Sequence, residues 1–246
     1  MASYLHDVAF VDAIEMRTLG SCSTWNPAGD QAAPPAAFPG YARYQRMDLA
    51  SRFVATAGTL LPPIPPSWAA STAVVLGTVD GSLDVDRAFA ASISTDRPAP
   101  ALYARTLPSI PGAELATMLG LHGPNWSIVQ RDEPVLLAIA AAHQEIVEGA
   151  CAAAFAGGYG LSSAGDPGDR WAVLVLLAAE PAARAPAWKV DVRRRPGPFA
   201  PRASRRVIDV LRDLAGGVGT PPVELAGATP GGEVVISISP ERRAPR

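Results

Sequence analysis

Strand-like and helix-like segments alternate along the chain, most clearly in its middle third. Residues 125–130 form a short strand-like run, and residues 152–158 form a second one that stops at a glycine pair. Between them, residues 133–149 are rich in alanine and indicate one long helix, with Asp132 as its expected N-cap and Pro134 in its first turn. Strands that alternate with helices predict an α/β fold, with a mainly parallel sheet and helices on both faces.

The flanking segments continue this alternation. Residues 47–61 carry apolar side chains at helical spacing and stop at Pro62-Pro63, and residues 110–119 form a further helix that Gly120 closes. The other elements that we expect are strands at 7–15, 72–78 and 171–178 and a helix at 84–92. Beyond residue 180 the pattern is weaker, and it indicates strands at 190–192 and 233–239 and a helix at 204–215.

The composition excludes several classes of function. Apolar residues make up 48% of the 246 residues and the formal net charge is −2, so a sizeable core can form and no excess charge attracts nucleic acid or an anionic membrane. No apolar run reaches the roughly 18 residues of a membrane span, and no signal peptide is evident. We therefore expect a soluble cytoplasmic protein, and we expect neither a cofactor nor a metal site.

The segment GLHGPNWSIVQRDEPVLLAIAAAHQEIVEGACAAAFAGG, residues 120–158, resembles the centre of the β-ketoacyl synthases. In that family a Gly-Pro pair, a strand, a nucleophile turn, a long helix and a strand ending in Ala-Gly-Gly follow one another. Gly123-Pro124 and Gly157-Gly158 fall at the family spacing, and the similarity extends over about residues 45–180. It implies a thiolase-like fold, essentially one βαβαβαββ half over residues 1–180, with a C-terminal extension over 181–246 that completes or flanks the same domain.

The resemblance puts Asp132 where the enzymes have their catalytic cysteine. A thiol at a helix N-terminus is activated as a thiolate by the helix dipole, whereas a carboxylate is a poor nucleophile toward a thioester and repels a developing oxyanion. The enzymes also need two histidines and a lysine from their C-terminal half, but after residue 158 this chain has no histidine and only Lys189. We therefore expect no catalytic residue in this chain.

These departures from the enzymes predict a non-catalytic subunit of the chain-length-factor type. It would pair with a full-length β-ketoacyl synthase as a heterodimer and shape its acyl tunnel in fatty acid, polyketide or aryl-polyene biosynthesis. The alternative is a reduced thiolase-fold synthase or acyltransferase that uses Cys22 as its nucleophile. A third possibility is a module that only binds an acyl carrier protein, for which Arg193, Arg194 and Arg195 are candidate contacts.

In β-ketoacyl synthases the strand before the nucleophile turn pairs across the dimer axis. The matching residues here are Asn125, Trp126, Ser127, Ile128, Val129 and Gln130, and we expect them to form the dimer interface with Trp126 as its anchor. The alternative is an internal strand with Trp126 in this chain's own core. Half a thiolase fold is also expected to leave one face of its layers uncovered.

Overall fold

The computed structural model describes residues 2–12, 15–18, 21–24, 41–95, 97–161, 170–181, 188–195, 207–215, 222–229 and 232–240. Within these residues, ten strands form one sheet. They are β1 (Ser3–Asp12), β2 (Glu15–Thr18), β3 (Ser21–Thr24), β4 (Thr72–Thr78), β5 (Asn125–Val129), β6 (Ala153–Leu161), β7 (Arg170–Ala178), β8 (Trp188–Arg195), β9 (Val223–Thr229) and β10 (Gly232–Pro240). The helices are α1 (Leu49–Leu60), α2 (Leu83–Ser94), α3 (Pro100–Tyr103), α4 (Ile110–Leu119), α5 (Pro134–Val147) and α6 (Val207–Ala215), with 3-10 helices at Tyr44–Arg46 and Pro66–Ser71.

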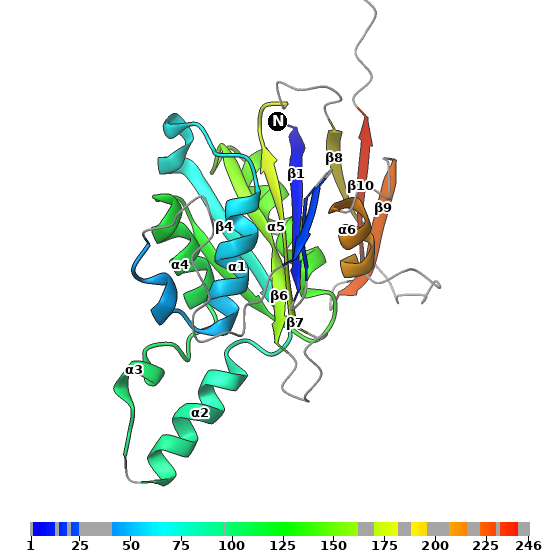
Figure 1. Ribbon diagram of the computed structural model, residues 1–246. Helices are drawn as coiled ribbons and strands as arrows, with labels where there is room; N and C mark the ends of the chain where they lie inside the picture. Colours follow the sequence, from blue (N-terminus) through cyan, green and yellow to red (C-terminus); the bar gives the residue numbers. More distant parts are fainter. Residues whose placement is uncertain are drawn as a thin grey trace, which may run out of the picture.

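The main path of the sheet runs β5-β4-β6-β7-β1-β8-β10-β9, and the β2–β3 hairpin is attached to β1 (Figure 1). The strands β5, β4 and β6 are parallel, and the other pairs of described strands are antiparallel. The α/β class with helices on both faces is confirmed, but the sheet is mixed rather than mainly parallel. Crossover helices connect β4, β5 and β6, which makes these strands parallel. The other strands are joined mainly by hairpin-type connections, which give antiparallel pairs.

Two apolar cores lie on opposite faces of the sheet. The first joins α1 and α4 to side chains such as Leu76 and Phe155, and the second joins α5 and α6 to side chains such as Val75 and Phe10. Neighbours along one strand, such as Val75 and Leu76, enter different cores because successive side chains of a strand point to opposite faces. The strand β4 is buried at all seven positions, which explains why the residues between Thr72 and Thr78 are all apolar or glycine.

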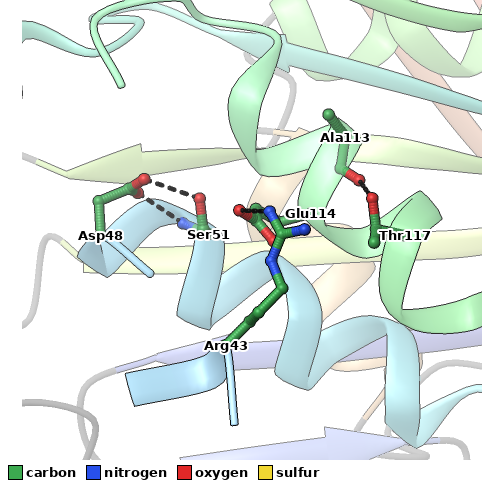
Figure 2. A network of polar contacts seen from close by, with 6 residues as sticks. All are labelled: Arg43, Asp48, Ser51, Ala113, Glu114 and Thr117. Atoms are coloured by element: carbon green, nitrogen blue, oxygen red, sulfur yellow. Dashed lines mark hydrogen bonds and ion pairs between the residues drawn. The ribbon is translucent and has the colours of Figure 1, made fainter. Parts of the chain in front are cut away.

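Polar contacts fix the start of α1 and tie it to α4 (Figure 2). The Asp48 carboxylate caps α1, accepting a hydrogen bond from the Ser51 backbone N–H at 2.8 Å and another from the Ser51 hydroxyl at 2.8 Å. Arg43, just before this helix, donates to the Glu114 carboxylate on α4 at 2.8 Å. The helix ends before Pro62, as the sequence predicts.

The expectation of an uncovered face is wrong for the long helix α5. Eight of its fourteen residues are buried, among them Leu136, Ile139 and Ile146. The helix lies against β4 and β6 on one side, and β8, β9, β10 and α6 contact it as well. The C-terminal strands continue the sheet, and the sheet curls far enough to bring them over α5. The chain therefore supplies its own cover for this helix.

The hairpin of α2 and α3 projects away from the body of the molecule (Figure 1). It follows the carboxyl end of β4, and of the α2 residues only Val85 is buried. The two helices contact each other through the rings of Phe89 and Tyr103, whose centroids are 5.3 Å apart. We call α2, α3 and residues 104–107 the arm.

Candidate functional site

The turn between β5 and α5 is the place where the resemblance puts the nucleophile. Here Glu133, and not Asp132, is the N-cap residue of α5, so the predicted cap is wrong. Glu133 has φ 47° and ψ 48°, and its side chain makes no capping hydrogen bond. It is the one non-glycine residue with positive φ in the described part of the chain, and Asp132 is exposed. A sharp left-handed turn of this kind is strained and is typical of functional sites.

Two glycines allow α5 to begin this close to the sheet. A Cβ atom on Gly77 of β4 would lie 2.0 Å from the Pro134 carbonyl oxygen, and a Cβ atom on Gly158 of β6 would lie 2.1 Å from the Gly77 carbonyl oxygen. Both contacts are with backbone, which has little freedom to move away. The position of the turn therefore depends on Gly77, which precedes Glu133 by 56 residues, and on Gly158, which follows it by 25 residues. The local sequence of the turn does not determine it alone.

A cavity of about 370 Å³ on the α1 and α4 face is apolar, whereas one of about 350 Å³ at the turn is mixed in character. The cavity at the turn is lined by Asp80, Arg131 and Glu133, by the aromatic rings of Tyr159 and Trp171, and by Val207 and Ile208 at the start of α6. In addition, β9 packs on the turn, since a Cβ atom on Gly227 would lie 2.5 Å from Glu133 Cγ. The described lining has no thiol and no imidazole.

Among the side chains that the structure describes, no cysteine or histidine provides a replacement nucleophile near this turn. Cys151 is buried just before β6, and burial raises the pKa of its thiol to about 11, which leaves it protonated at neutral pH. Cys22 lies in β3, but its side chain is outside the described residues. His122 precedes β5, so the length of this strand separates it from the turn.

His143 lies in the middle of α5, where its Nδ1 is 2.7 Å from the Ser3 hydroxyl on β1. The Ser3 side chain is buried, so this pair is a contact between α5 and the sheet rather than an accessible nucleophile and base. Burial lowers the pKa of the His143 imidazole, and the charge of Asp191 on β8 opposes this shift. His143 therefore favours its neutral form.

The strand β5 is at the edge of the sheet, with β4 as its one neighbour. Trp126 is 54% exposed, so the alternative that places it in this chain's own core is wrong. The Val74 N–H donates to the Pro124 carbonyl and the Gln130 N–H donates to the Thr78 carbonyl. Because these bonds alternate along a parallel pair, the even-numbered residues of β5 bond to β4. The N–H groups of Asn125, Ser127 and Val129 therefore face the open edge.

The candidate carrier-protein contacts lie on β8, at a distance along the sheet from β5. Arg193 pairs with Asp191 at 2.9 Å and Arg195 pairs with Glu233 at 3.2 Å, while Arg194 is exposed. Two of the three positive charges are thus partly neutralised within the chain. Among the described residues, no three His, Cys, Asp or Glu side chains gather as metal ligands would, and no described helix is long and apolar enough to cross a membrane.

Comparison with known proteins assigns the family. Residues 35–177, more than half of the chain, match the model of the β-ketoacyl synthase N-terminal domain. The chain belongs to this family. No curated protein sequence matches it. The match ends with β7, so the C-terminal strands and α6 that cover this β-ketoacyl synthase domain lie outside it.

Solved structures with a similar fold confirm the thiolase-like class. The complex of the ketosynthase ApeO with its chain length factor ApeC from Xenorhabdus doucetiae contains a chain with a TM-score of 0.60 at 13% identity, covering 97% of this chain and 99% of that chain. The ishigamide ketosynthase/chain length factor gives 0.56 at 16% identity, covering 79% and 68%. A β-ketoacyl synthase from Burkholderia phymatum STM815 gives 0.50 at 15% identity, covering 72% and 59%. At these identities the similarity establishes the fold.

Proposed function

We propose that this β-ketoacyl synthase family member is a non-catalytic, chain-length-factor-like subunit. It pairs with a full-length β-ketoacyl synthase and helps to shape the acyl tunnel in fatty acid, polyketide or aryl-polyene biosynthesis, as part of a cytoplasmic assembly. The turn before α5 carries this proposal, because it keeps the sharp geometry of a nucleophile turn but has Asp132 and Glu133 in place of a thiol. Two carboxylates there would oppose the negative charge of a tetrahedral intermediate.

The solved neighbours support the pairing. Two of them are complexes of a ketosynthase with a chain length factor, and one of their chains matches this one over nearly the full length of both. In this chain the open edge of β5 offers unpaired N–H groups beside the exposed Trp126. An edge strand with an exposed aromatic side chain suits strand addition by a partner. An acyl carrier protein is a further proposed partner, through Arg193, Arg194 and Arg195.

The chemical part of the proposal is tested by incubation with an acyl-carrier thioester followed by intact mass spectrometry. We expect no acyl adduct on this chain, whereas an active β-ketoacyl synthase in the same experiment becomes acylated. A stoichiometric adduct, above all on Cys22, would establish the reduced synthase instead. We also expect Asp132→Cys to create no condensing activity, because the groups that stabilise the condensation transition state are still missing.

The pairing is tested by co-expression with the full-length β-ketoacyl synthases of the same genome, followed by size-exclusion chromatography. We expect a heterodimer that Trp126→Ala weakens, since a buried tryptophan is a frequent hot spot of an interface. Val129→Pro removes an N–H group from the open edge and leaves the hydrogen bonds to β4 in place, so it should also weaken pairing. Ile128→Pro is the matched control, because it breaks a bond to β4 and should destabilise the chain itself. Heterodimers of unchanged affinity with Trp126→Ala and Val129→Pro would refute this interface.

A further inference from the structure

Exposed apolar side chains are confined to one part of the described chain. Six large apolar side chains are at least 50% exposed, and all of them lie between residues 79 and 129: Val79, Ile93, Tyr103, Leu107, Trp126 and Val129. Outside this range, the large apolar residues whose burial the structure describes are all at least partly buried. Exposed apolar surface is typical of sites of protein association when it is contiguous.

Three of these side chains belong to the arm, which is ordered by its own contacts. Besides the ring contact of Phe89 and Tyr103, the Ala99 N–H donates to the Ser92 hydroxyl at 3.1 Å, and the Arg97 N–H donates to the Ser92 carbonyl at 3.1 Å. The arm thus has a defined shape although little of it is buried. A surface that is ordered before binding loses less conformational entropy when it binds.

The base of the arm is joined to the open edge of β5. The Pro108 carbonyl accepts a hydrogen bond from the Ser127 hydroxyl at 3.1 Å and another from the Tyr159 hydroxyl at 3.2 Å. Burial raises the pKa of Tyr159 well above its ordinary value, so its hydroxyl remains a donor. A Cβ atom on Gly81 would be 3.3 Å from Pro108 and 3.9 Å from Val129. The base of the arm therefore lies against the side of β5 that carries Ser127 and Val129.

We propose that the arm is a clasp that closes on the same β-ketoacyl synthase subunit that adds to the edge of β5. This inference rests on the proposed function. A chain that pairs with β5 lies beside the carboxyl end of that strand, and the arm projects beyond this end (Figure 1). The exposed Ile93, Tyr103 and Leu107 then bury apolar surface on the partner, and the pairing of β5 fixes the register.

The test uses the full chain with and without the partner synthase, and the double variant Ile93→Ser/Leu107→Ser. Both residues are more than half exposed, so the variant should keep the parent's circular dichroism and melting temperature. We expect its dissociation constant for the synthase to rise about tenfold or more. The matched control, Lys189→Ser/Glu224→Ser, replaces two exposed residues on β8 and β9 and should bind like the parent.

Hydrogen–deuterium exchange of the same samples gives an independent readout. In the free chain the amides of α2 should exchange faster than those of the buried helix α5, because little of α2 is buried, and in the complex they should slow by about tenfold or more. If the parent binds the synthase but the arm variant binds equally well and α2 stays unprotected, the clasp is refuted while the proposed function stands. If the parent binds no synthase, the proposed function fails. Protection of α2 in a self-associated sample without synthase would assign the arm to a second copy of this chain, which also overturns the proposal.

Discussion

Replacing Gly77 with alanine tests whether close backbone contact, and not local sequence, positions the turn before α5. The added Cβ atom would lie 2.0 Å from the Pro134 carbonyl oxygen, 2.3 Å from its carbonyl carbon and 2.8 Å from the Val135 nitrogen. All three are backbone atoms of the first turn of α5, so this helix must move by roughly 1.5 Å to restore ordinary contact distances. Gly77 does not have positive φ, so the expected cost is steric.

We expect Gly77→Ala to lower the free energy of unfolding by about 3 kcal/mol or more, since overpacking against rigid backbone is at the upper end of such substitutions. Gly149→Ala is the matched control, because Gly149 has φ 78° and no atom within 4 Å of its added Cβ, which leaves a backbone cost of about 1 kcal/mol. Urea unfolding followed by circular dichroism measures both. The fluorescence of Trp171, which lines the cavity at the turn, should change in Gly77→Ala alone. Equal losses of stability in the two variants, with unchanged fluorescence, would refute the reasoning.

Two further predictions concern His143 and the helix caps. Burial lowers the pKa of His143 in the folded chain, so below its ordinary value near 6.5 the unfolded chain binds more protons. The free energy of unfolding should therefore rise with pH across the window just below 6.5 and level off above it. His143→Asn should flatten this rise in urea titrations at several pH values, and an unchanged slope would contradict the assignment. Asp48→Ala removes both capping bonds of α1 and should cost about 1 kcal/mol, whereas Asp132→Ala, at an exposed residue that is not a cap, should change stability by less than about 0.5 kcal/mol. Melting curves that show equal costs for the two would contradict these cap assignments.

Local signals predicted those elements whose own sequence pattern is strong. The strand over Thr72–Thr78 and the helix over Ile110–Leu119 have the bounds expected from the sequence, and Gly120 ends that helix with φ 65° as a left-handed cap. The family resemblance is confirmed by the match of residues 35–177. By contrast, β9 has the sequence VELAGAT, whose glycine and alanines give a weak strand signal, and it forms because β10 pairs with it.

The candidate site was harder to predict than the fold. The resemblance to the family located the turn. The N-cap residue is Glu133 and not the expected Asp132, because the close backbone contacts at Gly77 and Gly158 determine how α5 begins. The cover over the turn comes from α6 and β9, which follow it by more than 70 residues, and no local pattern links Gly227 to Glu133. The correct prediction of an edge position for β5 came from the resemblance rather than from its composition.

The strained turn has a structural role in this chain. A left-handed glutamate costs about 1–2 kcal/mol relative to a relaxed residue, so the turn persists because the contacts around it outweigh this cost. Gly77, on which α5 rests, is in register with Ile128 of β5, and the next residue, Thr78, accepts a hydrogen bond from the Gly81 N–H at the base of the arm. The packing that positions α5 against β4 therefore also positions the edge strand β5 and the base of the arm. The proposed function, in which the chain holds a partner, needs these elements to be rigid, and the packing around the turn before α5 supplies this rigidity.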